Sequence, residues 1–166
     1  MSLSPHASHA PRDSHSHDRS APSARDARHM AHALRLARLG SYTTQPNPRV
    51  GCVLVEAETD EVIASGFHVR AGEGHAEVNA LAEAGDRALG CVAYVTLEPC
   101  AMCAAAISHA RIRRLYFGAY DAKGGGVEHG PRFFAQPTCH HAPEVVGGLS
   151  ETEAGALLKD FFKERR

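Results

Sequence analysis

The sequence predicts a three-layer α/β fold, in which a mixed sheet of about five strands carries helices on both faces. Short apolar runs alternate along the chain with segments whose apolar residues recur at helical spacing. A strand, helix, strand order in the second half predicts that the two strands it joins are parallel. The length of 166 residues, 43% of them hydrophobic, fits one domain of ordinary size with a core of its own.

The first half of the chain predicts one helix followed by a β-hairpin. Apolar residues recur at helical spacing from about Asp26 to Leu39, and Gly40 supplies a C-terminal stop. Pro46 and Pro48 interrupt the chain before an apolar run at residues 50–55. An acidic turn at residues 58–60 leads to a second apolar run at 62–67, so the two runs are expected to pair as a hairpin.

The second half predicts alternating helices and strands. Helices are expected over residues 75–84, 100–109 and 151–163, and strands over 91–97 and 114–118. A Gly-rich loop covers residues 121–130, and the apolar pair at 145–146 is expected to form a short fifth strand. The strands at 91–97 and 114–118 are expected to be parallel because a helix connects them.

The first 25 residues differ in composition from the rest of the chain. They are rich in Ser, His, Pro, Ala and Arg and almost lack large apolar residues, so they cannot bury enough surface to offset the entropy of ordering. We expect a disordered tail at 1–25 and one folded domain at 26–166. Neither an apolar leader behind Met1 nor a run of transmembrane length is present, so we expect no export and no membrane partner.

Cysteine content and charge narrow the functional classes. Five cysteines are an odd number, which fits a reducing cytoplasm in which thiols remain available to bind metal. The net charge is −1, so the chain lacks the large basic excess of many nucleic-acid-binding domains. Residues 100–166 have a modest excess of positive charge, with nine basic and seven acidic residues. A polyanion would therefore bind there.

Two short motifs predict a catalytic metal site. The sequence has His75-Ala76-Glu77 and, after a predicted helix and strand, Pro99-Cys100-Ala101-Met102-Cys103. If Pro99 opens a helix, Cys100 and Cys103 lie on one face a single turn apart. His75 and the two thiolates would make three tetrahedral zinc ligands and leave a position open, as catalytic zinc sites do. Glu77 is close enough to exchange a proton with water there, and we interpret it as the general base.

Alternatives remain for each half of this pattern. A Cys-x-x-Cys pair also occurs in dithiol redox sites and in structural zinc sites. A redox pair would leave His75 unexplained, and a structural site would need a fourth ligand, whereas the other three cysteines stand singly. Both motifs begin predicted helices, whose N-terminal N–H groups and dipoles lower thiol pKa values and favour hydroxide.

The H-x-E and P-C-x-x-C motifs, in this order, resemble the signature of the cytidine deaminase-like superfamily over about residues 28–166. Residues 30–99 resemble the deaminase domain of the bifunctional riboflavin-biosynthesis protein, through 44–52, 66–68, 71–72 and 75–78. Residues 100–166 resemble the bacterial tRNA-specific adenosine deaminase, through 100–103, the loop at 121–124 and the end at 157–166. The fold implied is the cytidine deaminase-like fold.

The resemblance implies hydrolytic deamination of an amino-substituted nucleobase with one Zn²⁺ per chain. Our first choice of substrate is adenosine in a tRNA anticodon stem-loop, converted to inosine by a cytoplasmic homodimer. Asp121 would contact the ribose, Lys123, Arg165 and Arg166 would meet phosphates, and Asn47, His68 and Ala76 complete the expected substrate contacts. A turn-forming Asn47 and a solvated loop His68 are the structural alternatives for those two residues.

Departures from both relatives leave other substrates open. The His- and Gly-rich loop that binds ribose phosphate in the riboflavin family is absent between Cys100 and Cys103, as is the reductase domain. Against the tRNA family, His68 replaces an expected Asn, and a more acidic or neutral residue is usual at Asn47. The alternatives are the riboflavin-pathway pyrimidine, a free base or nucleoside, and a non-catalytic zinc or RNA-binding module. Glu77 argues against the last, because a structural site has no use for it.

Overall fold

The structure of this chain, a computed structural model, describes residues 21–40 and 43–163. Its helices are α1 (Ala24–Leu39), α2 (Ala76–Ala84), α3 (Ala101–His109) and α4 (Glu151–Lys163). Its strands are β1 (Gly51–Val55), β2 (Val62–Phe67), β3 (Val92–Leu97), β4 (Arg114–Ala119) and β5 (Glu144–Gly147). Every element expected from the sequence is present. Two short 3-10 helices, at Gly85–Ala88 and Phe133–Ala135, were not predicted.

The five strands form one mixed sheet in the order β2-β1-β3-β4-β5. β1 pairs antiparallel with both β2 and β3, which confirms the predicted hairpin. β3 and β4 are parallel, as the intervening helix predicted, and β5 extends the parallel part of the sheet. The carboxyl ends of β3 and β4 therefore lie at the same edge, next to the loops at residues 98–100 and 120–130.

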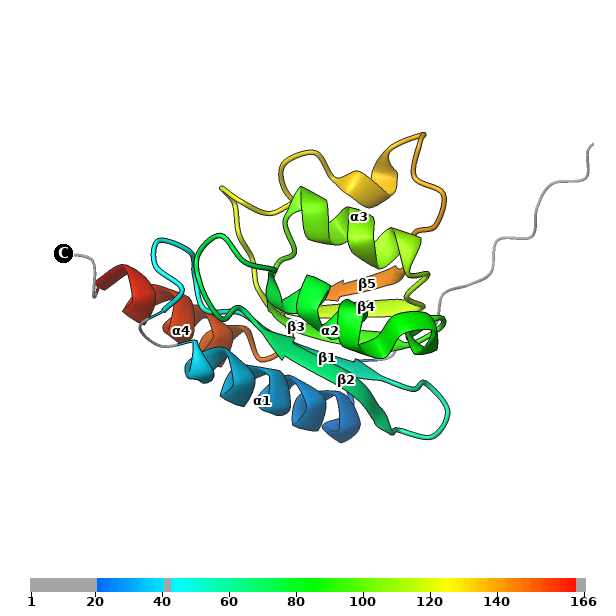
Figure 1. Cartoon of the computed structure of the whole chain (residues 1–166), viewed down its shortest axis with the longest axis horizontal. Coiled ribbons are helices and arrows are strands. Elements are labelled where there is room, and N and C mark those ends of the chain that lie inside the picture. Colours follow the sequence, from blue (N-terminus) through cyan, green and yellow to red (C-terminus); the bar gives the residue numbers. More distant parts are fainter. Residues whose placement is uncertain (1–20, 41–42, 164–166) are drawn as a thin grey trace, which may run out of the picture.

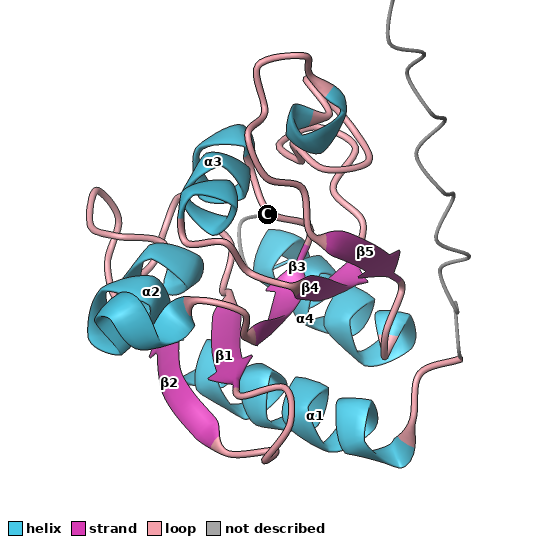
Figure 2. Cartoon of the chain, turned by 90° about the vertical axis from the view of Figure 1, so that its right-hand side faces the viewer, coloured by secondary structure: helices cyan, strands magenta, loops and turns pink. Residues whose placement is uncertain are grey.

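Helices cover both faces of this sheet (Figures 1 and 2). α2 and α3 lie on one face over a core cluster that includes Cys52, Val95 and Phe117. α1 and α4 lie on the other face over a cluster that includes Val53 and Tyr94. Neighbouring strand residues thus enter opposite cores, as the period of two requires, and the central strands β1, β3 and β4 are buried on both sides. The expected three-layer architecture is confirmed.

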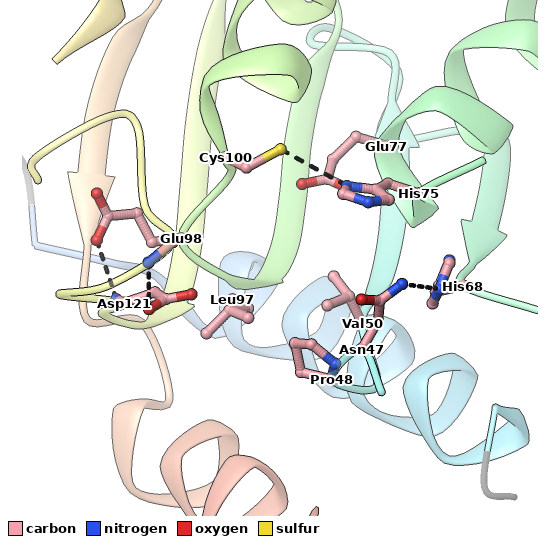
Figure 3. Close-up of a pocket in the computed structure, with 11 residues that line it drawn as sticks. Asn47, Pro48, Val50, His68, His75, Glu77, Leu97, Glu98, Cys100 and Asp121 are labelled. Atoms are coloured by element: carbon pink, nitrogen blue, oxygen red, sulfur yellow. Dashed lines mark hydrogen bonds between the residues drawn. The ribbon is translucent and has the colours of Figure 1, made fainter. Parts of the chain in front are cut away.

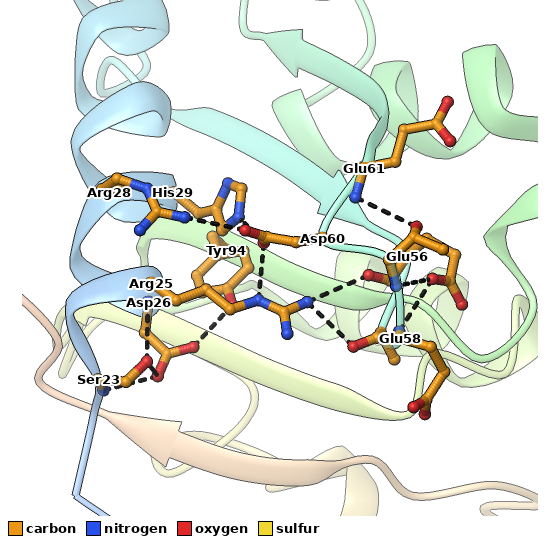
Figure 4. A network of polar contacts seen from close by, with 12 residues as sticks. Ser23, Arg25, Asp26, Arg28, His29, Glu56, Glu58, Asp60, Glu61 and Tyr94 are labelled. Carbon is orange, nitrogen blue, oxygen red and sulfur yellow. Dashed lines mark hydrogen bonds and ion pairs between the residues drawn. The ribbon is translucent and has the colours of Figure 1, made fainter.

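α1 begins at Ala24, two residues earlier than the sequence analysis expected, because Ser23 caps it. The Ser23 side chain accepts from the Asp26 N–H, and Asp26 accepts in return from the Ser23 N–H, which makes a capping box. Tyr94 on β3 donates its hydroxyl to Asp26 at 2.7 Å. Asp60 in the β1–β2 turn pairs with Arg25 and Arg28 (Figure 4). These contacts fix α1 to the sheet.

Within the described ranges, none of the helices has both the length and the apolar character needed to cross a lipid bilayer. Most of the predicted tail, residues 1–20, lies outside the described part of the chain.

The contact between α1 and β1 generates a stability prediction. A Cβ added at Gly51 would lie 2.0 Å from the Ala33 carbonyl oxygen, so Gly51→Ala has to push the helix and strand apart. Overpacking of this kind costs roughly 1–3 kcal/mol or more, and we expect the urea midpoint to fall accordingly. Gly155→Ala in α4 is the matched control, because a Cβ there meets nothing within 4 Å. The control should be neutral or stabilising, and an unchanged midpoint for Gly51→Ala would contradict the packing described.

Candidate active site

Three potential metal ligands meet where two helices begin. His75 is the N-cap of α2, Cys100 is the N-cap of α3, and Cys103 lies one turn into α3. From the sequence, we expected His75 and Cys100 at the first position inside their helices, which is one residue off. The Nδ1 atom of His75 lies 3.6 Å from the Cys100 sulfur and 3.4 Å from the Cys103 sulfur. All three ligand atoms are within 4.8 Å of one another.

These separations fit tetrahedral zinc. With the usual Zn–N and Zn–S bond lengths, two ligands at the tetrahedral angle lie about 3.6 Å apart. Both measured N···S separations agree with that value within a few tenths of an ångström. Among the described residues, one group of three or more His, Cys, Asp or Glu side chains lies close enough together to share a metal ion, and it is this His-Cys-Cys set. The donor set therefore suits zinc and leaves a coordination position for water or substrate.

The thiols of Cys100 and Cys103 differ in pKa even without a bound metal ion. Hydrogen bonding from Cys103 and the nearby His75 together lower the pKa of Cys100 to about 5, against the effect of burial. The same hydrogen bond and burial raise the pKa of Cys103. The cluster thus holds one thiolate readily, and a cation at this position would favour ionisation of the second.

Glu77 lies beside the ligands in the first turn of α2, and only 4% of its surface is exposed. Burial raises the pKa of its carboxyl group, and the charge of Cys100 acts in the same direction. A carboxyl group with a raised pKa is suited to both accepting and returning a proton near neutral pH. The structure therefore gives Glu77 the surroundings of a general acid and base.

A pocket of about 180 Å³ opens in front of these residues (Figure 3). Its size suits a single ring system better than a drug-sized ligand, for which about 300 Å³ or more is usual. It draws residues from the loops before β1 and α2 and from the carboxyl ends of β3 and β4. The lining consists of Asn47, Pro48, Val50, His68, His75, Glu77, Leu97, Glu98, Cys100, Asp121 and Gly124.

Asn47 and His68, the two predicted base contacts, lie together in this pocket. His68 is buried, and its Nδ1 is 3.1 Å from the Gly74 carbonyl oxygen. A carbonyl oxygen only accepts, so Nδ1 donates to it, and Nε2 lies 3.2 Å from the Asn47 amide nitrogen. The alternative interpretation of His68 as a solvated loop residue is wrong, because only 2% of its surface is exposed.

The other predicted substrate contacts divide into three groups. Asp121 lines the pocket, and its Oδ1 accepts from the backbone N–H groups of Lys123 and Gly124. Lys123 is exposed on the same loop, and Ala76 is fully buried at the start of α2. Neither lines the pocket. Arg165 and Arg166 lie outside the described residues.

One ionisable residue of the pocket was not identified from the sequence. Glu98 directly follows β3 and precedes Pro99, and its side chain has no exposed surface. Burial acts to raise the pKa of Glu98, but hydrogen bonds from the Asp121 N–H, the His129 ring and two further N–H groups lower it overall. An acidic residue next to a buried apolar strand was the available signal, since such a carboxylate needs internal partners.

The ligand geometry predicts the outcome of metal analysis. Cys103→Ala removes one of three protein ligands, so we expect zinc to fall from about one per chain to a small fraction of that value. Cys139→Ala is the matched control, because Cys139 is a half-buried thiol outside the cluster, bonded to Ser108 and the His141 carbonyl. Elemental analysis of both purified variants decides the point. Full zinc in Cys103→Ala would remove this residue from the ligand set.

Comparison with known proteins places the site in a family. Residues 23–119 match the family described as the cytidine and deoxycytidylate deaminase zinc-binding region. The tRNA-specific adenosine deaminase of Agrobacterium fabrum is 65% identical over 81 residues, which cover 49% of this chain and 53% of that protein. Its counterpart in Rickettsia bellii is 38% identical over 146 residues, covering 82% of this chain and 99% of the relative.

Relatives of a second kind match over a similar length. The riboflavin biosynthesis protein RibD of Escherichia coli is 41% identical over 147 residues, covering 85% of this chain and 38% of RibD. The match thus spans about half of the Agrobacterium protein and less of RibD.

A solved structure from studies of A-to-I editing by tRNA:A34 deaminases is 47% identical, with a TM-score of 0.71, covering 79% of this chain and 99% of that one. The fold and the family agree with the resemblance seen in the sequence. The chain belongs to the cytidine and deoxycytidylate deaminase family, whose members share this zinc-binding region.

Proposed function

We propose that this chain is a hydrolytic deaminase that converts adenosine to inosine in the anticodon loop of tRNA. The observation that carries the proposal is that one base-sized pocket is lined by the buried Glu77 and by two members, His75 and Cys100, of the His75-Cys100-Cys103 cluster. Support for the substrate comes from the relatives named tRNA-specific adenosine deaminase, one of which is matched over 99% of its length.

Zinc held by His75, Cys100 and Cys103 would supply Lewis-acid chemistry, which makes water acidic enough to give hydroxide near neutral pH. Glu77 accepts the proton that water loses as its oxygen attacks the ring carbon bearing the amino group. Glu77 delivers this proton to the adjacent ring nitrogen, then takes the proton of the hydroxyl group now on the attacked carbon and gives it to the leaving amine, so that ammonia departs and a carbonyl group remains. Water and the amino compound are thus converted to ammonia and the oxo base.

The remaining pocket residues would orient the base. Because the Asn47 amide nitrogen is bonded to His68, its oxygen is available to accept from a donor on the substrate (Figure 3). Asp121 keeps Oδ2 available for a ribose hydroxyl, since Oδ1 is used within its own loop. Glu98 does not take part in proton transfer, because hydrogen bonds occupy both its oxygens.

Contacts outside the pocket would hold the RNA. Lys123 is exposed on the loop that carries Asp121, where it can reach a phosphate, and Arg165 and Arg166 would extend this basic surface. Anticodon bases are already unpaired, so placing one in the pocket costs little. We propose that the enzyme works in the cytoplasm as a homodimer. The exposed Met102 in the first turn of α3 gives this helix an apolar surface suited to such a contact.

The riboflavin-pathway pyrimidine is the second candidate substrate. The observation that favours it is the hydrogen-bonded pair of Asn47 and His68 in the pocket, because both belong to the segments that resemble the riboflavin enzyme. The RibD protein of Escherichia coli matches this chain over 85% of its length.

Glu77→Gln tests the proton-transfer role. It keeps the size of the side chain but removes the base, so we expect turnover to fall by roughly 10²- to 10⁴-fold. Zinc content should stay at the wild-type value, because Glu77 is not in the ligand cluster. Glu153→Gln on the exposed side of α4 should leave both quantities unchanged. Zinc lost together with activity would show that Glu77 supports the metal and would end its assignment as proton shuttle.

A substrate panel tests the choice of RNA. Ammonia release should be faster from an anticodon stem-loop containing the target adenosine than from the riboflavin-pathway pyrimidine, cytidine, cytosine or guanine. Replacing Lys163, Arg165 and Arg166 by Ala should weaken RNA turnover and flatten its salt dependence, because fewer counterions are then released. Turnover of a free nucleoside should hardly change. Preference for the pyrimidine would show that Asn47 and His68 set the specificity, and the order of the two candidates would be reversed.

A further inference from the structure

The carboxylate of Glu98 organises the loop that forms one wall of the pocket. One oxygen, Oε1, accepts from three consecutive backbone N–H groups, those of Val127, Glu128 and His129, at 3.3, 2.8 and 2.9 Å. The other, Oε2, accepts from the Asp121 N–H at 3.0 Å and faces Nδ1 of His129 at 2.7 Å. Both ends of the segment at residues 121–129 are therefore tied to a single buried side chain.

Three glycines allow the loop to wrap this closely. A Cβ at Gly125 would lie 2.5 Å from the carboxyl carbon of Glu98, and one at Gly126 would lie 2.4 Å from the Ala101 nitrogen. One at Gly124 would lie 2.8 Å from Oδ2 of Asp121. The backbone thus follows the surface of Glu98 and of the α3 N-terminus, which leaves no room for side chains.

His129 is the one side chain in this arrangement that donates to Glu98. Its ring packs edge-on against Tyr120, with centroids 6.1 Å apart, and Tyr120 packs in the same way against Phe117 of β4. The imidazole is thus held against the sheet on one side and against the carboxylate on the other. A charged acceptor makes this hydrogen bond stronger than a neutral one.

We propose that Glu98 and His129 are positioning residues for the deamination reaction. They hold the segment 121–129 so that Asp121 lies at the pocket wall with Oδ2 directed to the substrate ribose. This inference rests on the proposed function, because it assigns Asp121 a contact with substrate. Glu98 and His129 themselves touch neither the substrate nor the reacting atoms.

The test compares His129→Ala with His129→Asn. Alanine removes the donor to Glu98, whereas the Asn amide nitrogen occupies a position like that of Nδ1 and can restore it. With anticodon stem-loop RNA, we expect His129→Ala to raise KM about tenfold, the effect of one lost charge-assisted hydrogen bond. kcat should stay near the wild-type value, because a contact made equally in ground and transition states affects KM alone. His129→Asn should bring KM most of the way back to the wild-type value. Zinc should remain at about one per chain in both variants.

A double variant shows whether the effect acts through Asp121. If the effect of His129→Ala acts through Asp121, the double variant Asp121→Ala/His129→Ala should have the same KM as Asp121→Ala alone. The reason is that the contact between Asp121 and the substrate is already lost in the single variant. Exposed His140→Ala is the matched control and should behave as wild type. Additive effects of the two substitutions, or an unchanged KM in His129→Ala, would overturn the inference.

Hydrogen exchange gives a readout that needs no substrate. The N–H groups of Asp121, Val127 and Glu128 are bonded to Glu98, so they should exchange slowly in wild type, faster in His129→Ala and again slowly in His129→Asn. Unchanged exchange in His129→Ala would overturn the inference whatever the substrate is. If wild type fails to deaminate the stem-loop while exchange changes as expected, the proposed substrate is wrong and the loop-holding role of the pair is retained.

Discussion

The site depends on one constraint, which is that two helices must begin at the same place on one face of the sheet. His75 and Cys100 are N-caps, so their side chains meet only if the starts of α2 and α3 nearly touch. Glycines permit the close backbone approach on which this depends. A Cβ at Gly66 would lie 2.5 Å from the Ala76 carbonyl oxygen, and one at Gly126 would lie 2.4 Å from the Ala101 nitrogen. The ligands therefore come from helix ends fixed by main-chain packing, which is a more precise support than a loop.

Most of the fold could be predicted because the elements are strongly patterned. Val92–Leu97 is an apolar run broken only by Thr96, and the helix between β3 and β4 required the parallel pairing that is observed. Helix starts were less accurate, since they depend on side-chain caps. Ser23 and Asp26 extend α1 by two residues through a capping box, which hydrophobic spacing does not reveal.

The metal ligands could be predicted because they lie in two short motifs. The hydrogen bonds by which Glu98 holds the pocket loop could not be predicted. Glu98 is bonded to residues 23 to 31 positions further along the chain, in a Gly-rich loop with no periodicity. The sequence also cannot show which of the three pocket carboxylates, Glu77, Glu98 or Asp121, transfers protons and which are structural or bind substrate. Burial raises the pKa of Glu77, a ring of donors lowers that of Glu98, and Asp121 bonds its own loop, so only the environment assigns their roles.

Chemistry and recognition are thus supplied by different parts of one pocket. The helix starts carry the metal ligands, and the loops carry the contacts to the base.

X-ray absorption at the zinc edge of the purified chain tests most directly whether His75, Cys100 and Cys103 are the zinc ligands. We expect two sulfur ligands at about 2.3 Å and two nitrogen or oxygen ligands at about 2.0–2.1 Å, one of them an imidazole. A shell of four sulfurs, or one of oxygen alone, would contradict it.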